Sequence, residues 1–375
     1  MKKAIFYFLF LLFNLVLAEF ILSLFDKENV IVKGYDKNLL FAMYPNKTGM
    51  VVSDEYSVKV ETNRLGFRQH LAEHQSYRNI VLGDSFTEGW GVREKEVYIH
   101  LLNKKLPTEK RFLNLGMHGA SPILFALQLP HFLKQYKPDS VIIQLFDNDL
   151  DDNEKLQKFI SNENGSLKPK KRIAASFLGE TLYNFCKETT LYRLFQRVYK
   201  KVKGIPSPIL YYKPGKEPQV KTLTYQQAVE KYGELKPLGN TINTKYNNQF
   251  GFYKDNDSRW KSLLSKQKKL LELLVKQANN AKVKLQFLYI PAREFFAKGG
   301  ILGDIKTDDK QEFYTKNPHY LLIKDVCDRN QLECIYASDL FFANHPEKLY
   351  FPHDAHLNSL GHAVLAKGLY ERMQQ

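Results

Sequence analysis

Cysteine is scarce in this chain: Cys186, Cys327 and Cys334 are the three cysteines among 375 residues. So few cysteines exclude a small fold built on a disulfide framework. The chain also lacks internal repeats, and low-complexity sequence is confined to the short basic run at 168–172. Hydrophobic residues make up 44% and charged residues 25%, which excludes a collagen-like or mainly disordered protein. The body of the chain is therefore expected to fold around an ample core.

Acidic residues are outnumbered, since 55 Lys and Arg stand against 40 Asp and Glu for a net charge of +15. The excess is local, because the segment from Gly165 to Lys221 alone holds thirteen basic and three acidic residues. One basic region does not indicate a surface that coats nucleic acid, so nucleic acid is not an expected partner. We interpret the region either as a surface for an acidic glycan or anionic lipid headgroups, or as a solvated cap without a partner.

One long hydrophobic run stands at the N-terminus, from Ala4 to Phe25, and Glu19 is its one charged residue. At about 1.5 Å per helical residue it reaches roughly 33 Å, enough to cross a bilayer. We predict an uncleaved signal-anchor at residues 1–25. The alternative is a cleaved signal peptide with a cut after Ala18.

The flanks of this run predict its orientation. The basic pair Lys2 and Lys3 precedes it and acidic residues follow it, which keeps the N-terminus in the cytoplasm. The rest of the chain is then periplasmic or extracellular, tethered to a bacterial inner membrane, or secreted to the periplasm after cleavage. In such an oxidising compartment Cys327 and Cys334 are close enough in sequence to pair, and two unpaired buried thiols are the alternative.

Short apolar runs alternate with amphipathic stretches along the rest of the chain. The predicted strands cover 78–83, 112–116, 140–146, 283–290 and 333–337. One predicted helix ends near 102, and three others cover 123–135, 259–281 and 318–330. This alternation implies a five-stranded parallel sheet covered by helices on both faces, hence a three-layer α/β/α fold. Ligands of such sheets gather at the carboxyl ends of the strands.

The alternation stops in the middle of the chain. We predict one α/β domain in two parts, 26–150 and 258–375, separated by a long insertion at 151–257 that is a candidate cap or lid. Two helices are expected within the insertion, at about 173–186 and 191–202.

The first predicted strand runs into Gly83, Asp84 and Ser85, which places Ser85 on a strand-to-helix turn. A hydroxyl raised at a helix N-terminus suits a nucleophile, because developing negative charge is favoured there. The same pattern also suits an ordinary N-cap serine. The remaining motifs decide between the two.

Three further segments carry groups that fit a nucleophilic site. Gly116 ends the second strand, Gly119 follows it and Asn148 follows the third strand, and all three are plausible donors to an oxyanion. Near the C-terminus Asp354 stands two residues before His356. At that spacing the carboxylate can orient one imidazole nitrogen while the other nitrogen faces a hydroxyl.

These four blocks, in this order at the ends of predicted strands, resemble the GDSL or SGNH hydrolases and acyltransferases. The resemblance runs from about residue 62 to residue 371, interrupted by the insertion, and implies a flavodoxin-like SGNH-hydrolase fold. Ser85 matches the nucleophile and first oxyanion donor, Gly119 the backbone donor and Asn148 the side-chain donor. Asp354 and His356 match the closing Asp-x-His element of the triad.

The chain departs from the family pattern at two positions. Phe86 replaces the leucine of GDSL, and Phe146 replaces a glycine that often begins the third block. Neither change removes a reacting group. Arg68 belongs to a block that looks like an element of membrane-tethered members, and we expect it to pack beside the site. His118 lies in the oxyanion turn, where we expect a structural or incidental role.

The resemblance implies a serine esterase that cleaves acyl esters, with short chains favoured, on a carbohydrate or lipid through an acyl-enzyme. One alternative is an O-acyltransferase that modifies a cell-surface glycan or lipid, which would need a multi-span membrane partner or an extracytoplasmic acyl donor. The other is a catalytically inactive, membrane-tethered binding module.

Neither a cofactor nor a metal is expected. His353, His356 and His362 near Asp354 lack the helical i, i+4 ligand spacing of a zinc site. The aspartates at 147, 149, 151 and 152 resemble a cation loop, but they lack the glycine and the final glutamate of a calcium-binding hand. We interpret them as a solvated strand end.

Overall fold

The structure of the chain is a computed structural model. It describes residues 2–24, 33–53, 55–71, 77–163, 166–170, 189–202, 221–222, 227, 230, 234–237, 250–253, 258–295, 305–306, 314–344, 348–352 and 354–374. The helix predicted at 173–186, most of the insertion and His353 lie outside the described residues.

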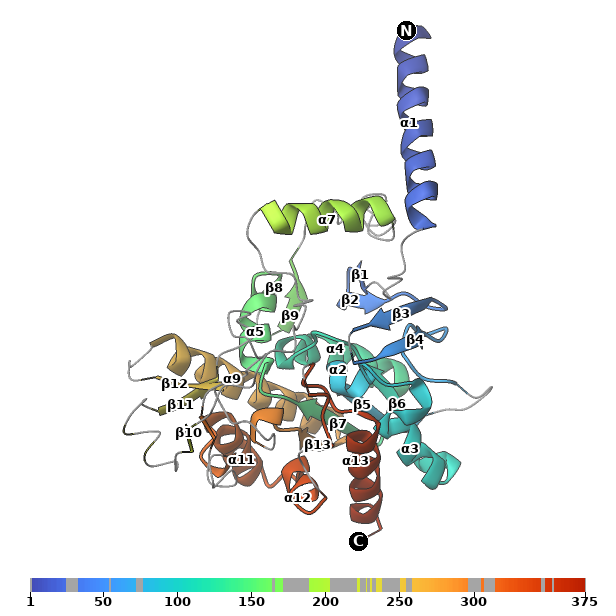
Figure 1. The fold of residues 1–375 in the computed structure, drawn as a ribbon. Helices are drawn as coiled ribbons and strands as arrows, with labels where there is room; N and C mark the ends of the chain where they lie inside the picture. The colour runs from blue at the N-terminus through green and yellow to red at the C-terminus, as the bar shows by residue number, and fades with distance from the viewer. Residues whose placement is uncertain are drawn as a thin grey trace.

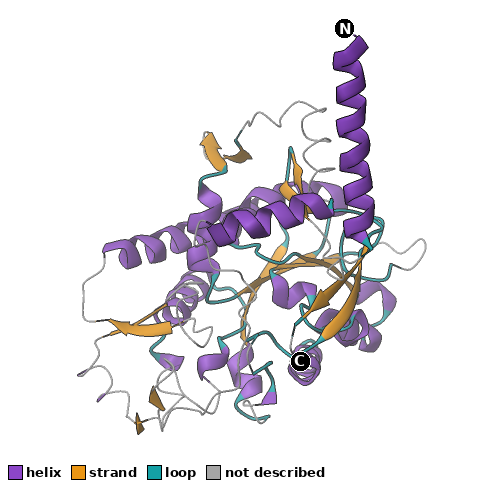
Figure 2. Cartoon of the chain, turned by 45° about the horizontal axis from the view of Figure 1, so that its top comes forward, coloured by secondary structure: helices purple, strands orange, loops and turns teal. Residues whose placement is uncertain are grey.

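A parallel five-stranded sheet forms the centre of the molecule, with strand order β15-β13-β7-β5-β6. Its strands are β5 (Asn79–Gly83), β6 (Phe112–Gly116), β7 (Ser140–Leu145), β13 (Lys284–Tyr289) and β15 (Cys334–Tyr336). Most of their side chains are buried, because helices cover both faces of the sheet (Figure 2). The prediction of an α/β fold with a five-stranded parallel sheet is confirmed.

Two groups of helices form the outer layers. They are α2 (Ser85–Glu88), α3 (Tyr98–Lys105), α4 (Pro122–Tyr136), α9 (Ser258–Ala281), α11 (Pro318–Asn330), α12 (Ala337–Phe341) and α13 (Ser359–Arg372), with short 3₁₀ turns at Glu94–Glu96, Thr108–Lys110 and Arg293–Phe295. α3 connects β5 to β6 and α4 connects β6 to β7, in opposite directions along the sheet, so right-handed crossovers place them on opposite faces. α9 packs on α4 and α11 on α9, while α13 packs on α3 and α12 on α13.

The strand order also indicates where a ligand crevice is expected. β6 and β7 lie on either side of β5, so the chain reverses its direction of winding there. In doubly wound sheets the ligand site opens at such a reversal, outside the carboxyl ends of the strands. Ser85 follows β5 and Asn148 follows β7, which brings both to this crevice.

The amphipathic stretch predicted to end near Leu102 is divided into two helices. Gly89 and Gly91 have φ of +87° and +81°, which ends α2 after a single turn. A Cβ on Gly89 would lie 2.2 Å from a methyl carbon of Val97, so a side chain does not fit at this close approach. The prediction of helix from the amphipathic periodicity was correct, but the turn between the two helices depends on these two glycines.

Two β-hairpins precede the sheet and were not predicted. They pair β1 (Lys33–Asp36) with β2 (Leu40–Met43), and β3 (Thr48–Val52) with β4 (Ser57–Glu61). Met43, Val51 and Val60 are buried in the main core, and Gln128 of α4 donates to the carbonyl of Leu39 at 3.0 Å. The hairpins are thus part of the same packed body as the sheet.

Further elements lie in or beside the insertion. They are α5 (Asp149–Gln157), the hairpin of β8 (Ile160–Glu163) and β9 (Ser166–Pro169), α7 (Thr190–Val202), the pair β10 (Lys221–Thr222) and β14 (Ile305–Lys306), and the hairpin of β11 (Glu234–Pro237) and β12 (Phe250–Tyr253). α7 confirms the helix predicted at 191–202.

The helix α1 (Lys2–Ser23) stands clear of the folded body in Figure 1. Its segment Ile5–Ser23 has a mean hydropathy of 2.4 and is not buried by the rest of the chain. It is therefore long and apolar enough to cross a membrane, a property that an N-terminal signal sequence shares.

Cys327 and Cys334 form a disulfide, with their Cα atoms 6.2 Å apart. The bond joins the last turn of α11 to the first residue of β15. Of the two alternatives left open by the sequence, the paired one is present. Disulfides of this kind persist in oxidising compartments.

Candidate active site

Ser85 is placed by the turn between β5 and α2. Gly83 ends β5, and a Cβ there would lie 2.1 Å from Thr87 Oγ1 and 2.6 Å from Gln144 Oε1, so this sharp turn has no room for a side chain. Asp84 caps α2 by accepting a hydrogen bond from the backbone N–H of Phe86 at 2.8 Å. Ser85 is then the first residue of the helix, where N–H groups favour negative charge.

Asp354 and His356 are brought face to face by the residue between them. Ala355 has φ of +70°, in the left-handed region that residues with a side chain rarely occupy. The backbone N–H of Phe351 donates to the carbonyl of His356 at 2.8 Å, which closes the segment into a tight turn. The left-handed residue folds the chain back so that two side chains two positions apart meet.

A continuous hydrogen-bond chain joins the three predicted triad residues. His356 Nε2 lies 2.7 Å from Ser85 Oγ, and His356 Nδ1 is hydrogen-bonded to Asp354 Oδ1. With the imidazole proton on Nδ1 and directed to the carboxylate, Nε2 accepts the hydroxyl proton of Ser85. This arrangement matches the roles of nucleophile, base and orienting acid.

Two residues that the sequence did not indicate hold Asp354 in place. The hydroxyl of Tyr56 donates to Asp354 Oδ2 at 2.6 Å, and the backbone N–H of Asp354 donates to Glu55 Oε2 at 2.7 Å. The ring of Tyr56 also packs on Phe351, with centroids 4.9 Å apart. These residues lie between β3 and β4, and no motif links that hairpin to the C-terminal block, so a single sequence carries no signal for them.

The electrostatics of the triad favour an ion pair. Burial opposes the charge on Asp354, but His356 and the Tyr56 hydrogen bond outweigh it and lower the pKa of Asp354 below its ordinary value. Burial likewise opposes protonation of His356, but Asp354 outweighs it and raises the pKa of His356 above the ordinary range. His356 is thus a stronger base than a free imidazole.

Asp84, which directly precedes Ser85 in the chain, carries a buried carboxylate. Burial, together with the charge of nearby Asp152 and against the hydrogen bond from Phe86, raises the pKa of Asp84 to about 7. One carboxylate oxygen of Asp84 has no hydrogen-bond partner among the residues that the structure describes. Near neutral pH this group is therefore partly protonated.

The two departures from the family pattern turn out to be neighbours. The rings of Phe86 and Phe146 lie 4.3 Å apart, and Phe86 lies 5.0 Å from the imidazole of His356. The side chains that replace a leucine and a glycine thus pack against each other and form an apolar wall beside the base. The ring of Trp90 lies 6.4 Å from the imidazole of His356.

The three predicted oxyanion groups differ in their surroundings. The N–H of Gly116 donates to Asn114 Oδ1 at 2.8 Å, and a Cβ on Gly116 would lie 2.4 Å from Glu88 N, so Gly116 serves packing. Gly119 instead is exposed, with φ of +67°. Asn148 caps α5 without a side-chain cap bond, and its Oδ1 has no hydrogen-bond partner in the described part of the chain.

Their positions after the strands place both groups at the same end of the sheet as Ser85. Gly119 follows β6 and Asn148 follows β7, and these strands flank β5 on its two sides. The carboxyl ends of the three strands therefore lie side by side, at the end of the sheet where Ser85 follows β5. Gly119 and Asn148 remain the candidate oxyanion donors, whereas Gly116 is no longer a candidate.

His118 has a partner that explains its position in the oxyanion turn. Its Nδ1 lies 2.8 Å from Glu88 Oε2, and its backbone N–H also donates to that oxygen. Lys33 Nζ donates to the carbonyl of His118. Buried Glu88 thus holds the turn that presents Gly119, which is the structural role expected of His118.

Arg68 packs beside the site, as expected. It is buried, and its guanidinium donates to the carbonyls of Gly89 and Val92. These carbonyls belong to the loop that follows α2. Arg68 therefore holds the loop that carries Trp90.

The interpretation of the aspartates after β7 as a solvated strand end was wrong. Asp147, Asp149 and Asp152 are buried. Asp147 accepts hydrogen bonds from the hydroxyl of Tyr289 and, at 3.0 Å, from the backbone N–H of Ala292. These donors come from β13 and the loop after it, more than 140 positions away, so the local sequence could not reveal them. Among the described residues no group of three potential metal ligands is present.

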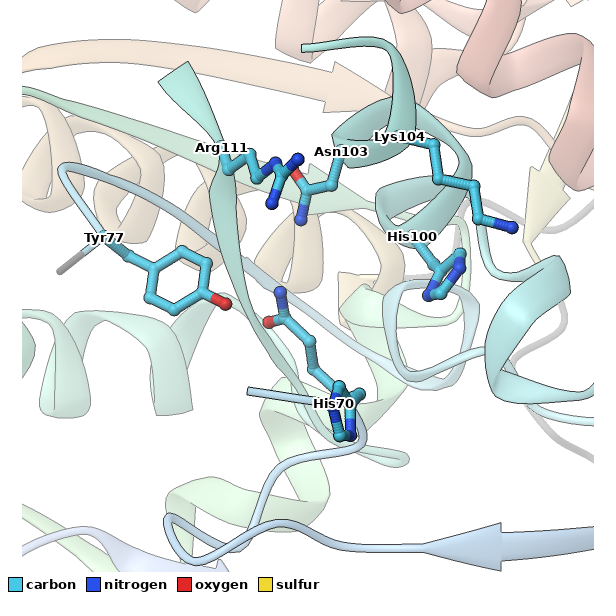
Figure 3. Close-up of a pocket in the computed structure, with 7 residues that line it drawn as sticks. His70, Tyr77, His100, Asn103, Lys104 and Arg111 are labelled. Carbon is cyan, nitrogen blue, oxygen red and sulfur yellow. The ribbon is translucent and has the colours of Figure 1, made fainter. Parts of the chain in front are cut away.

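Two cavities lie away from the triad. Figure 3 shows the first, about 190 Å³, lined by Gln69, His70, Tyr77, His100, Asn103, Lys104 and Arg111. The second, about 840 Å³, shares Gln69, His70 and His100 with it and extends over β4. Neither is lined by Ser85, Asp354 or His356. Ser85 lies instead at the carboxyl end of β5.

Comparisons with known proteins found no matching family model and no matching curated protein. Solved structures with a similar fold include the psychrotrophic esterase EstA from Pseudoalteromonas sp. (11% identity, 79% of this chain and 97% of that chain, TM-score 0.38). A member of the lipolytic protein G-D-S-L family from Veillonella parvula is 12% identical over 79% of this chain and 98% of its own, with a TM-score of 0.38. The acetyl xylan esterase AlAXEase is 14% identical over 78% of this chain and 98% of its own, with a TM-score of 0.39. At these scores the chemistry of the chain rests on the side chains described above.

Proposed function

We propose that this chain is an SGNH-type serine esterase that cleaves acyl esters through an acyl-enzyme. The observation that carries the proposal is the unbroken hydrogen-bond chain from Ser85 through His356 to Asp354. A serine that only capped a helix would need no imidazole at 2.7 Å, and that imidazole would need no carboxylate behind it.

In this mechanism His356 takes the proton of Ser85 as the hydroxyl oxygen attacks the ester carbonyl. Asp354 keeps the imidazole oriented and stabilises its positive charge. The N–H groups of Ser85 and Gly119 and the side chain of Asn148 bind the oxyanion of the tetrahedral intermediate. His356 then returns its proton to the leaving alcohol, and a water molecule deprotonated by His356 releases the acid.

Substitution of Ser85 by alanine tests this function. Turnover of a short-chain activated ester is expected to fall by roughly 10⁵- to 10⁶-fold, because the covalent route is lost. The melting temperature should change little. Ser140→Ala serves as the control, since this serine lies at the amino end of β7, at the opposite edge of the sheet. If a serine-directed phosphonate fails to label Ser85 in the intact protein, the chain is a binding module instead.

The natural acceptor is proposed to be water, with an ester-bearing carbohydrate or lipid as substrate. Water needs no binding site of its own, whereas an O-acyltransferase needs a second site for a hydroxyl acceptor. Incubation of the acyl-enzyme with glycan acceptors separates the two. Release of free acid supports the esterase, and dominant acyl-glycan formation at millimolar acceptor supports a transferase.

We further propose that the catalytic body is extracytoplasmic and held to the membrane by an uncleaved α1. The lysine pair before the apolar run and the disulfide of Cys327 and Cys334 support this location. Protease added to spheroplasts should digest the body and spare the first residues. A soluble protein that begins at Glu19 would instead establish cleavage of a signal peptide.

A further inference from the structure

The helix α7 presents an apolar face that the described part of the protein leaves uncovered. Its apolar residues recur at intervals of three and four positions, at 191, 194, 195, 198, 199 and 202. Of these, Leu194, Phe195, Val198 and Tyr199 are exposed by 42%, 65%, 52% and 46%. At 100° per residue these positions share one side of the helix, so they form a continuous exposed apolar stripe.

The opposite side of α7 is basic. The positions on that side hold Arg193, Gln196, Arg197, Lys200 and Lys201. No acidic residue occurs in the helix, and α7 lies within the basic segment 165–221 identified from the sequence. A helix with an apolar side and a Lys- and Arg-rich side is typical of helices that lie in the interface of an anionic bilayer.

α7 is joined to the apolar helix α1 by a specific contact. The carboxylate of Glu19 accepts hydrogen bonds from the backbone N–H groups of Thr190 at 2.7 Å and Leu191 at 2.9 Å. These are the first N–H groups of α7, which have no acceptor within the helix. The one charged residue of the apolar run therefore caps the amphipathic helix, and this explains a carboxylate that would otherwise be costly in a membrane span.

The position of Glu19 also sets the depth of α7. Glu19 lies four residues before the end of α1, about 6 Å along the helix axis at 1.5 Å per residue. Amphipathic interfacial helices lie about 5–10 Å into the boundary between headgroups and acyl chains. Figure 1 shows α7 running crosswise to α1 near the end of α1 that adjoins the body. The contact thus holds α7 at the level of the interface.

We propose that α7 lies in the plane of the membrane interface, with its apolar stripe among the acyl chains and its basic positions toward anionic headgroups. The proposal rests on the proposed role of α1 as an uncleaved span and deepens it. The span and the in-plane helix together hold the catalytic body at a set height above the bilayer. A substrate in or on that surface is then within reach, as the basic segment attracts anionic lipid.

Tryptophan fluorescence in nanodiscs tests the position of α7. The full-length chain carrying Phe195→Trp is reconstituted in phosphatidylcholine and phosphatidylglycerol, with or without brominated acyl chains, which quench nearby tryptophan. The control is Leu321→Trp, on α11, where the native leucine is 48% exposed. Subtraction of the wild-type signal removes the native tryptophans. Brominated lipid should quench Trp at 195 by roughly half or more and leave Trp at 321 unchanged.

Equal quenching at both positions, in discs that contain the protein, would overturn the proposal. A blue shift at position 195 that grows with protein concentration and ignores brominated lipid would also overturn it, in favour of a second copy of the chain. If the chain instead begins at Glu19 and does not enter discs, the anchor proposal has failed. The same two variants mixed with brominated anionic vesicles then test α7 by itself.

The contact of Glu19 provides an independent readout. Glu19→Ala should raise hydrogen exchange of the first α7 amides about fivefold, because their cap is lost. Ser23→Ala, whose hydroxyl bonds only within α1, is the matched control. Unchanged exchange in Glu19→Ala would contradict the coupling of the two helices.

Discussion

Ser85 and the pair Asp354–His356 meet in one hydrogen-bond chain, but different parts of the molecule place them. Ser85 is positioned by its immediate neighbours, since Gly83 ends β5 and Asp84 caps α2. The acid–base pair sits on a loop and is held by the β3–β4 hairpin, with 298 positions between Tyr56 and Asp354.

This difference predicts two kinds of damage. The nucleophile is embedded in buried, closely packed elements, so changes near it should act mainly on folding. The acid–base loop is held by hydrogen bonds at the edge of the body, so changes there should act mainly on catalysis. The following substitutions test that division, from the largest expected effect to the smallest.

Asp354→Asn should lower kcat about 10⁴-fold with little loss of stability, because the amide cannot hold the imidazole in the required tautomer. Steady-state kinetics and thermal unfolding measure the two effects. The hydrogen bond from Tyr56 can still be accepted by the amide oxygen, so the loop should stay in place. A loss below tenfold would show that another carboxylate orients His356.

Asn148→Ala should lower kcat by roughly 10²- to 10³-fold with little change in KM, the scale of one oxyanion donor. Asn153→Ala is the matched control, because this buried asparagine bonds to Ile123 and Gln267 instead of facing the crevice. The control should lose stability and keep its kcat. A change in KM alone for Asn148→Ala would assign that residue to substrate binding.

Gly83→Ala should destabilise the fold by about 3 kcal/mol, because the added methyl group collides with Thr87 and Gln144. Denaturant unfolding measures the loss. Gly119→Ala is the comparison, since a Cβ there meets only Lys33 Nζ at 3.2 Å, although its positive φ adds some strain. If Gly83→Ala were fully stable yet inactive, the position of Ser85 would not depend on packing as proposed.

Tyr56→Phe should lower kcat about tenfold, since a hydrogen bond to a charged group is lost while the ring stays on Phe351. Without the hydroxyl, more negative charge on Asp354 faces His356. The pKa of His356 therefore rises, and the acid limb of the pH profile should move to higher pH. Tyr350→Phe, which removes a hydroxyl bonded to the carbonyl of Pro291, should leave that limb unmoved.

The central architecture follows from the sequence because its signals are local. Apolar runs such as 112–116 and 140–146 are continuous since both faces of a parallel sheet are buried, and the observed strands agree within one or two residues. The motif around Ser85 is local as well, because strand end, cap and helix start are consecutive residues. The Asp-x-His spacing also pointed to the pair at 354 and 356.

Tertiary structure alone decided the groups that meet across long stretches of chain. Tyr56 and Glu55 carry no motif, and their role exists only because the β3–β4 hairpin packs beside the C-terminal loop. The burial of Asp147 depends on hydrogen-bond donors from β13 and the loop after it. The local sequence therefore predicted a solvated residue. In the sequence, Glu19 is only a charged residue that interrupts an apolar run. In the structure it accepts hydrogen bonds from the first N–H groups of α7. Periodicity reports the local backbone, whereas the partner of a polar side chain is set by how distant segments pack.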